Sequence, residues 1–379
     1  MNHQLRSRLR AMTLVELMVV MAIIGLLITV MVPVVKYQYR NRSVKEGERQ
    51  LNSFIGAAQA RAQQLGRPVG IWIERFSKEA PIPVAGDNPA LNRFLLAGAN
   101  YAVQIYQAEV PRPYTGDLRD SRVTVTYNGT AWAINFPPTS ALLNAKKPLI
   151  REWEPFKIQF DHRGPFHEGK RIADIIVNQG QMDERKIPQY VLLPETIRTG
   201  VPFLKSGITG RAVPYTIHRR PVRSFVAPLR LPQGAVIDLS VSGTGPSGTE
   251  FISSSVAAAQ RPVVVMFYPD GSVGDVYFGG KVDRPLGWIH FLVGRQEMVF
   301  PTNQLLKTET EQANLMHNEN RWVSINHRTG TVTSELPANI DKLVRALAKD
   351  DTLTAAEKFA ASVASSRELV RTGTGLEDD

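Results

Sequence analysis

The sequence of 379 residues predicts an α+β fold, with one long N-terminal helix packed on an antiparallel, β-rich globular head and short helices after it. Three observations predict this class. An apolar run at 12–35 continues into a helical stripe over 36–66. Short alternating runs with turn signals occupy 67–337. Short amphipathic patterns in 338–379 indicate that helices follow the strands.

The composition limits the kinds of function before any motif is considered. The chain is 43% hydrophobic and 21% charged, a balance typical of a globular protein. It contains no cysteine, which excludes disulfides, thiol nucleophiles and thiolate metal sites. Its net charge of +10 favours acidic partners such as lipid headgroups, nucleic acid or an acidic protein, without choosing among them.

The first predicted element is the segment 12–35, MTLVELMVVMAIIGLLITVMVPVV, whose one charged residue is Glu16. As a helix rising about 1.5 Å per residue it would be about 36 Å long, enough to cross a hydrocarbon core of about 30 Å. Arg6, Arg8 and Arg10 precede it, and basic residues beside a span favour the cytoplasmic side. The sequence therefore predicts a single-pass transmembrane helix with its N-terminus in the cytoplasm.

Two simpler interpretations of this segment leave Glu16 unexplained. A secretory signal peptide needs a small-x-small cleavage site, and the following residues VVKYQYRNR lack one. An ordinary single-span anchor, which would retain residues 1–11, has no use for a costly carboxylate at membrane depth. A cut between Ala11 and Met12 would instead create an α-ammonium four residues from Glu16. Pairing between neighbouring subunits would then offset the desolvation of both charges.

The stretch MTLVELMVVMAIIGLL behind a short basic leader resembles the processing signature of type IV prepilins and type II secretion pseudopilins. The resemblance implies cleavage between Ala11 and Met12, N-methylation of Met12, and a role for Glu16 in assembly. It also implies a helix bend at Pro33, where proline deletes a backbone hydrogen bond; a proline that the membrane helix simply tolerates is the other interpretation. The chain departs from the signature in having Ala11 where glycine is usual and Met12 where phenylalanine is usual.

The helix is expected to continue over 36–66 as an amphipathic segment. Its apolar residues recur at helical spacing and would form one stripe against a sheet. They are Tyr37, Val44, Leu51, Ile55, Ala58, Ala62 and Leu65. Gly66 and Pro68 predict the end of the helix. Charged residues beside the stripe, among them Arg61, are interpreted as a solvated face, with an intersubunit face as the other interpretation.

Residues 67–337 are expected to form the head. Runs rich in β-branched and aromatic residues predict strands at 69–74, 101–107, 156–160 and 171–177. Asn128 and Gly129 lie between alternating runs and predict a type I′ hairpin, because both accept positive φ. Two further hairpins are predicted, with turns at 269–271 and 328–330. The expected product is an antiparallel sheet assembly packed on the helix.

The order of elements resembles the H-type minor pseudopilins and FimT-like minor pilins. The helix-to-strand passage LNSFIGAAQARAQQLGRPVGIWIE is similar to theirs, and LPQGAVIDLSVSG, VMFYPDGSVGDVYF and RWVSINHRTGTV follow their order. The resemblance implies a pilin-like head and a minor subunit. Because the chain is longer than usual members, 76–230 is interpreted as an enlarged or inserted β-region.

The end of the chain, 338–379, is expected to hold short helices and a disordered tail. Leu343, Val344 and Leu347 share one helical face, and Thr354 with Glu357 forms a capping-box pattern ahead of a second helix. The glycine-rich, acidic end TGTGLEDD predicts disorder.

No motif gives positive evidence for catalysis, so the sequence predicts a protein that is not an enzyme and that uses no cofactor. The loop SGTGPSGTE lacks the lysine and the following Ser/Thr of a phosphate-binding loop. Asp161, His162 and His167 have metal-ligand character, but their sequence DHRGPFHEG is broken by glycine and proline and favours a surface loop. No metal site is therefore predicted.

The basic run HRRPVRSF is a candidate nucleic-acid contact. Arg219, Arg220 and Arg223 would neutralise phosphates while Phe225 stacks on a base. Some FimT-like minor pilins bind DNA during uptake, so the resemblance allows the same interpretation. A solvated strand edge or a lipid-facing patch is the other interpretation of this run.

The resemblance implies a structural minor subunit, assembled through its helix into a type II secretion pseudopilus or a type IV pilus-like filament. The implied partners are a prepilin peptidase/N-methyltransferase, other pilin or pseudopilin subunits, an inner-membrane assembly platform and membrane lipid. The implied location is the bacterial inner membrane, single-pass, with the head in the periplasm. Two alternatives stay open: a minor pilin whose basic head binds DNA or another ligand, and an unprocessed membrane-anchored β-domain.

Overall fold

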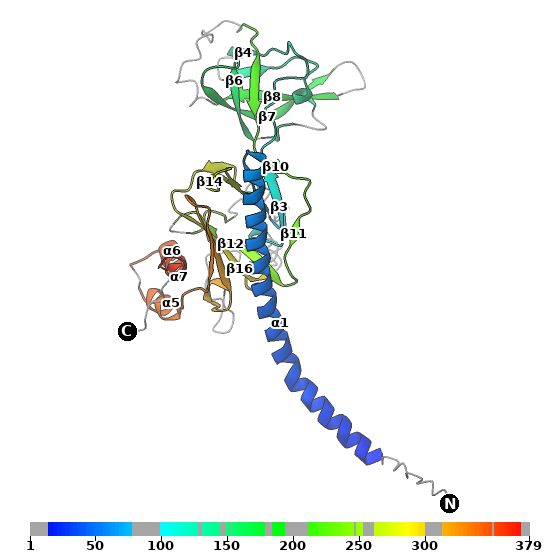
Figure 1. The fold of residues 1–379 in the computed structure, drawn as a ribbon, viewed down its shortest axis with the longest axis vertical. Helices are drawn as coiled ribbons and strands as arrows, with labels where there is room; N and C mark the ends of the chain where they lie inside the picture. The colour runs from blue at the N-terminus through cyan, green and yellow to red at the C-terminus, as the bar shows by residue number, and fades with distance from the viewer. Residues whose placement is uncertain are drawn as a thin grey trace, which may run out of the picture.

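The computed structural model describes the backbone of residues 14–77, 99–127, 131–144, 149–152, 154–178, 184–193, 211–245, 248–252, 261–299, 313–350 and 352–372. Side chains are described for all of these except 30, 32–40, 173–178, 184–186, 348, 355–356 and 371–372. Within these residues the fold consists of one long helix, three antiparallel sheets and short helices near the C-terminus (Figure 1).

Helix α1 (Leu14–Leu65) projects from the head with its N-terminal half and packs on the head with its C-terminal half (Figure 1). The stripe residues Val44, Leu51, Ile55, Ala58 and Ala62 are each at most 1% exposed and join the main hydrophobic core. The stripe ends there, because Leu65 is 44% exposed. Gly66 stops the helix as predicted: it adopts φ 58°, a left-handed conformation that glycine reaches without strain.

Two antiparallel sheets enclose the core under α1. Sheet A has the order β10-β3-β1-β13-β14-β15, with β11 also paired to β3. Its strands are β1 (Val69–Glu74), β3 (Gln104–Glu109), β10 (Val222–Arg223), β11 (Leu229–Arg230), β13 (Val263–Phe267), β14 (Val273–Phe278) and β15 (Lys281–Asp283). Sheet B has the order β18-β17-β16-β12-β2. Its strands are β2 (Tyr101–Ala102), β12 (Ala235–Gly243), β16 (Trp288–Arg295), β17 (Arg321–Asn326) and β18 (Val332–Glu335).

The sequence predicted several of these strands. The strand at 69–74 is β1, and the hairpins turning at 269–271 and 328–330 are β13–β14 and β17–β18. The single strand predicted at 101–107 is wrong, because the chain changes sheets within it. Tyr101 and Ala102 pair with β12 in sheet B, whereas the residues from Gln104 onward pair with β1 in sheet A.

A third sheet, sheet C, forms a separate unit with the order β4-β5-β8-β7-β6-β9. Its strands are β4 (Thr124–Tyr127), β5 (Trp132–Asn135), β6 (Pro155–Phe160), β7 (Phe166–Asn178), β8 (Glu184–Leu192) and β9 (Tyr215–His218). Strands β6 and β7 contain the predicted 156–160 and 171–177. Strands β4 and β5 pair as the hairpin around Asn128 and Gly129 requires, although the turn itself lies outside the described residues.

Sheet C has its own hydrophobic core, which includes Val125, Ile158 and Tyr190. In the chain it lies between β3 and β10, two strands that pair directly through Glu109 and Val222. The chain thus leaves sheet A, builds sheet C and returns to the neighbouring position. We call the described residues of 114–218 the inserted unit; it lies beyond the C-terminal end of α1 (Figure 1).

Three helices cover the second face of sheet B: α5 (Asp341–Ala348), α6 (Ala355–Ser366) and α7 (Glu368–Thr372). Their apolar side chains enclose Trp322, whose Nε1 donates to Ser366 Oγ at 3.0 Å. The predicted capping box of Thr354 and Glu357 is confirmed at the start of α6. Short 3-10 helices lie at η1 (Ala141–Leu143), η2 (Gln296–Met298) and η3 (Asn314–Met316). The predicted disordered tail falls outside the described residues.

The predicted α+β class is confirmed in outline, as an N-terminal helix, antiparallel sheets and a few short helices. In the parts of the chain that the structure describes, no helix is both long and apolar enough to cross a membrane. The transmembrane prediction for 12–35 is therefore not confirmed.

Candidate functional site

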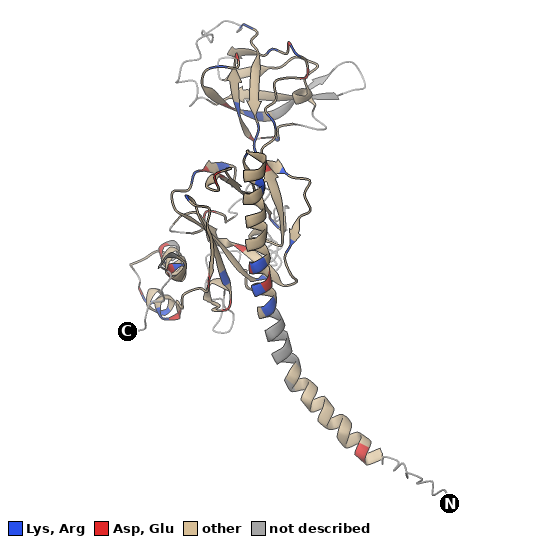
Figure 2. Cartoon of the chain, viewed as in Figure 1, with Lys and Arg blue, Asp and Glu red and all other residues tan. Residues whose placement is uncertain are grey.

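The N-terminal end of α1 carries the predicted processing and assembly residues. Ala11 and Met12 lie outside the described residues. Glu16 lies in the first turn of α1, in a stretch of helix that is otherwise without charge (Figure 2). A carboxylate in the first turn is favoured by the positive end of the helix dipole. Pro33 lies within α1, which continues past it to Leu65, but its side chain is outside the described residues.

The side chains on both sides of Glu16 form an apolar surface around the N-terminal part of α1. Their exposed fractions range from 37% for Val20 to 75% for Leu14. The exposed residues are Leu14, Val15, Leu17, Met18, Val19, Val20, Met21, Ile23, Ile24, Leu26, Leu27, Ile28 and Met31. A helix that is apolar on every side is normally buried by lipid or by other helices, and a contiguous patch of this kind marks an interaction surface.

The outer face of sheet A carries a second feature, a row of large side chains on four adjacent strands. Tyr106, Trp72, Val264 and Tyr277 are direct cross-strand partners in that order, and we call them the aromatic row. Alternate residues of a strand face opposite sides. Since Ile71 lies in the core under α1, the row faces away from α1. Trp72 is 6% exposed and Val264 2% exposed, so this second face is also covered.

An arginine lies over each aromatic ring of the row. From guanidinium carbon to ring centroid the pairs are Arg223 over Tyr106 at 4.6 Å, Arg151 over Trp72 at 5.7 Å, and Arg220 over Tyr277 at 5.3 Å. Attraction between a cation and a ring face is favourable at these distances. Arg151 belongs to the inserted unit, while Arg220 and Arg223 lie on the returning chain. The row therefore holds the inserted unit and its connection against sheet A.

The three arginines of the predicted nucleic-acid contact have different surroundings. Arg220 is half-buried, and its Nη2 donates to the carbonyl oxygen of Gly280 at 3.1 Å. Arg223 forms an ion pair with Glu74 at 2.8 Å. Burial lowers the pKa of Arg219 and of Arg220. The arginines are thus partly engaged inside the protein, and DNA binding remains a prediction.

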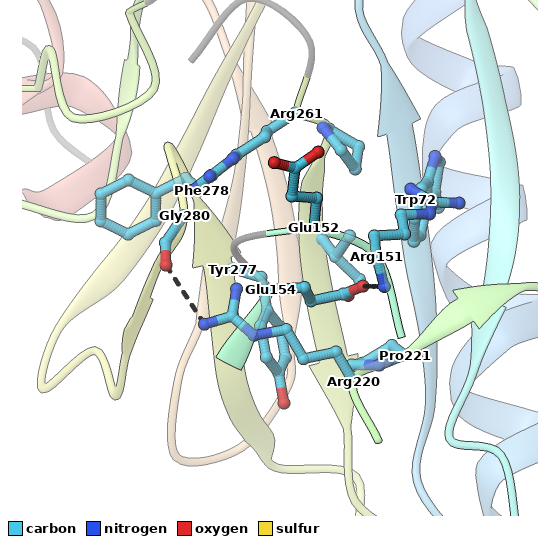
Figure 3. A pocket seen from close by; sticks show the side chains of 12 residues that line it. Trp72, Arg151, Glu152, Glu154, Arg220, Pro221, Arg261, Tyr277, Phe278 and Gly280 are labelled. Carbon is cyan, nitrogen blue, oxygen red and sulfur yellow. Dashed lines mark hydrogen bonds between the residues drawn. The ribbon is translucent and has the colours of Figure 1, made fainter. Parts of the chain in front are cut away.

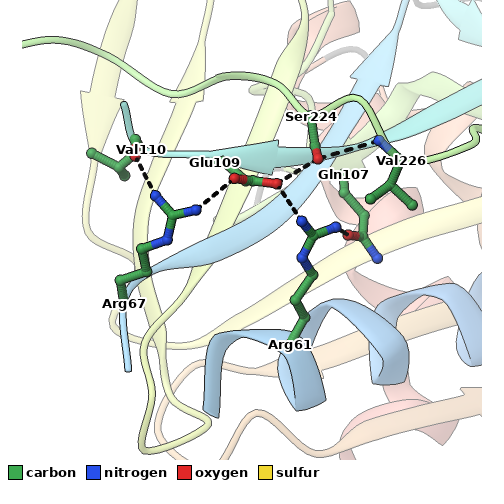
Figure 4. A network of polar contacts seen from close by, with 7 residues as sticks. All are labelled: Arg61, Arg67, Gln107, Glu109, Val110, Ser224 and Val226. Carbon is green, nitrogen blue, oxygen red and sulfur yellow. Dashed lines mark hydrogen bonds and ion pairs between the residues drawn. The ribbon is translucent and has the colours of Figure 1, made fainter. Parts of the chain in front are cut away.

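A cluster around Glu109, which we call the carboxylate clasp, joins α1 to both connections of the inserted unit (Figure 4). Its carboxylate accepts hydrogen bonds from Arg61 at 2.8 Å, Arg67 at 2.8 Å and Ser224 Oγ at 2.5 Å. The interpretation of Arg61 as part of a solvated face is wrong, because its side chain is 29% exposed and paired. Helical spacing identified the apolar stripe but not this distant partner.

A cleft of about 370 Å³ lies where the inserted unit meets sheet A (Figure 3). Sheet A contributes Trp72, Val264 and Tyr277 to its wall. The opposite side contains Arg151 and Glu154 of the inserted unit and Arg220 of the returning chain. Glu154 accepts a hydrogen bond from the backbone N–H of Arg151 at 3.2 Å. The cleft thus combines charged groups with an apolar floor.

Residues 6–32 match the family model described as the prokaryotic N-terminal methylation motif. The match contains Glu16 and the apolar surface of α1, and it supports the type IV pilin and pseudopilin class and processing by a prepilin peptidase. It does not extend to the head, so the H-type resemblance is not confirmed. No curated protein and no solved structure matches the chain.

The residues considered for metal binding lie apart. His162 is at the turn after β6, where its Nδ1 lies 2.7 Å from Thr216 Oγ1, whereas His167 is 2% exposed within β7. Among the described residues, no group of three or more His, Asp or Glu side chains is placed to hold a metal ion.

Sequence reasoning missed the aromatic row and the cleft. The available signal was the alternation in VGIWIE, which puts Trp72 on the face opposite Ile71 and Ile73. Alternation alone does not reveal what covers that face. The covering residue Arg151 comes from the inserted unit, 79 positions later in the chain than Trp72.

Proposed function

We propose that this chain is a minor pilin or pseudopilin subunit, cut between Ala11 and Met12 and assembled through α1 into a type II secretion pseudopilus or a type IV pilus-like filament. The observation that carries the proposal is the methylation motif at 6–32 on a helix whose apolar side chains are exposed all round. Its role is structural, not catalytic. The passage from α1 to β1 and the antiparallel head support an H-type subunit with a pilin-like head.

Burial of the N-terminal half of α1 is the physical basis of this assembly. Complete burial of a Leu, Ile, Val or Met side chain contributes about 1.5–3 kcal/mol relative to water. In the proposed pathway the helix lies first in the inner membrane, with Arg6, Arg8 and Arg10 on the cytoplasmic side and the head in the periplasm. Neighbouring helices then replace lipid around it, and close packing determines their association.

Glu16 is proposed to set the register of neighbouring subunits. A carboxylate among apolar side chains is favoured only beside an opposite charge, and the cut would supply one at the α-ammonium of Met12 in a neighbour. The prepilin peptidase, the other subunits and the assembly platform are the proposed partners. An unprocessed anchor would have neither the new ammonium nor this use for Glu16.

The N-terminal mass of the protein isolated from its native membrane tests the processing step. A chain that begins with N-methylated Met12 is the expected result. An intact leader, with residues 1–11 retained, would contradict the proposal and favour an ordinary anchored β-domain.

Replacement of Glu16 by alanine tests the assembly step. The variant should be processed and its head should melt at the wild-type temperature, while its amount in sheared filaments falls about tenfold or more, since breaking a buried ion pair costs several kcal/mol. Thr29→Ala is the matched control, because Thr29 lies in the same apolar segment and donates only to its own helix, to Gly25 at 2.8 Å. Normal incorporation of Glu16→Ala would contradict the register role.

A further inference from the structure

Three arginines and two glutamates line the cleft at the inserted unit, so its lining carries a net positive charge. Arg151, Arg220 and Arg261 line it, as do Glu152 and Glu154. Within the described part of the chain none of the three arginines forms an ion pair there: Arg220 donates to the carbonyl oxygen of Gly280, and Arg261 to that of Gly279 at 3.3 Å. A half-buried guanidinium that donates only to a neutral carbonyl keeps its charge unpaired. A bound anion would stabilise that charge.

Burial is the main reason that the pKa of Arg220 is lowered; Glu154, Tyr277 and Glu168 oppose that effect only in part, and Arg261 adds to it. An anion in the cleft would reverse this shift by stabilising the charged guanidinium. The planar group is held over Tyr277, so its orientation is restricted before any ligand arrives.

Trp72 supplies an independent observation. Its indole lines the cleft and is 6% exposed, and its Nε1 has no hydrogen-bond partner among the residues that the structure describes. A buried N–H without an acceptor costs about 1–3 kcal/mol, so an acceptor provided by a ligand would recover that energy. A negatively charged oxygen acceptor would therefore serve both groups: it would pair with the Arg220 guanidinium, which now donates to a neutral carbonyl, and accept from Trp72 Nε1.

The spacing of the aromatic row limits the size and shape of a ligand in the cleft. Trp72 and Tyr277 lie on either side of Val264, two strand spacings apart, which is about 10 Å. Val264 and Pro262 form the apolar wall in this region. The arginines already cover the faces of Trp72 and Tyr277, so those faces are not open to stacking by a flat ligand.

We propose that this cleft binds a small amphipathic anion, whose carboxylate or phosphate contacts Arg220, whose apolar part lies on Val264, and which offers an oxygen to Trp72 Nε1. A volume of about 370 Å³ suits a ligand of about dipeptide size. Glu152 and Glu154 disfavour a polyanion, which separates this site from the DNA contact predicted from the sequence. The inference does not depend on filament assembly.

The test uses the full-length protein in detergent, labelled with fluorotryptophan and observed by fluorine NMR. The chain has five tryptophans, and the signal of Trp72 is assigned by its loss in Trp72→Phe. The probes are N-acetyl-Leu-Leu, its neutral C-terminal amide, and monobutyl phosphate. We expect a saturable shift of the Trp72 signal at millimolar concentrations with one or both anions and none with the amide. The anion that binds shows whether the cleft selects a carboxylate or a phosphate.

Variants locate the binding site by calorimetry. Arg220→Gln should weaken binding of the active anion by about tenfold to a hundredfold, because a charge-assisted hydrogen bond is lost. Arg230→Gln, at an exposed arginine of β11 outside the cleft, should leave affinity unchanged. Trp72→Phe keeps an aromatic ring at this position but removes the Nε1–H donor. It should weaken binding about threefold to tenfold. Trp72→Phe provides the test if Arg220→Gln lowers the melting temperature too far for binding to be measured.

The proposal is overturned if neither anion shifts the Trp72 signal, or if the amide binds as tightly as the acid. It is also overturned if Arg230→Gln weakens binding as much as Arg220→Gln. Each result can be obtained whether or not the leader is cut, so failure here is distinguishable from failure of the proposed filament role.

Discussion

Replacing Glu109 by glutamine tests how the inserted unit is fastened to the head. The Glu109 side chain is 18% exposed and binds Arg61 and Arg67, which are 29% and 40% exposed. Glutamine keeps the size of the side chain and one carbonyl acceptor, but it loses the charge that attracts both guanidinium groups. Ser224 would also donate to a neutral acceptor in place of a carboxylate.

The expected loss of stability follows from this partial burial. A hydrogen bond to a charged group contributes about 1.5–3 kcal/mol when buried, and an exposed ion pair contributes about 0.2–1 kcal/mol. Discounting both pairs for their exposure gives a total of about 2–3 kcal/mol for Glu109→Gln. At about 2–4 °C per kcal/mol for a domain of about 150–250 residues, that corresponds to a fall in melting temperature of about 4–12 °C.

The assay is thermal unfolding of the full-length protein in detergent, followed by circular dichroism. Glu46→Gln is the matched control, because Glu46 makes a single exposed ion pair with Arg49 at 3.1 Å, and it should melt at the wild-type temperature. Added salt should narrow the difference between wild type and Glu109→Gln only slightly, since partly buried pairs are screened less. Equal melting temperatures for wild type and Glu109→Gln would refute the fastening role of the carboxylate clasp.

Two further predictions concern the part of the head that is built from sheets A and B. Burial raises the pKa of Asp238 from 3.8 to about 6, so the charged form destabilises the fold by about 3 kcal/mol above that pH. The stability of wild type relative to Asp238→Asn should therefore rise by up to about 3 kcal/mol as pH falls from about 7 to about 4, measured by urea unfolding. Gly330→Ala should lose about 2–4 kcal/mol in the same assay, because φ is 69° and a Cβ would lie 2.0 Å from the carbonyl oxygen of Gly271. Gly234→Ala, with φ 84° and open space around the position, should lose only about 1–2 kcal/mol.

Two outcomes would contradict these expectations. A stability difference between wild type and Asp238→Asn that does not change with pH would mean that Asp238 keeps a normal pKa. Equal losses for Gly330→Ala and Gly234→Ala would mean that the close approach of the two hairpin turns is relieved without cost.

Local signals predicted the elements that depend on neighbours in sequence. The stripe from Val44 to Ala62, the stop at Gly66 and the hairpin turns at Gly271 and Gly330 all follow from spacing or from positive φ. These features require only a few consecutive residues to agree. The N-terminal motif belongs to the same class, and the family match at 6–32 rests on it.

Features that depend on distant residues could not be predicted. The change of sheet after Ala102 depends on β12, and the pairing of Arg61 depends on Glu109, 48 positions away. Likewise, Arg220 is held by Gly280 through a contact that no local pattern records. The candidate cleft consists wholly of such contacts, whereas the candidate assembly segment is continuous in sequence.

The direct pairing of Glu109 with Val222 has a mechanical consequence. The inserted unit lies beyond the end of β3, so tension applied to it along the direction of α1 runs lengthwise into β3 (Figure 1). Strand β3 is paired with β1 from Glu74↔Gln104 to Val69↔Glu109. A lengthwise pull shears this ladder and loads its hydrogen bonds together, whereas a sideways pull would open them one at a time. The head can thus transmit load from the inserted unit to α1 without unzipping sheet A.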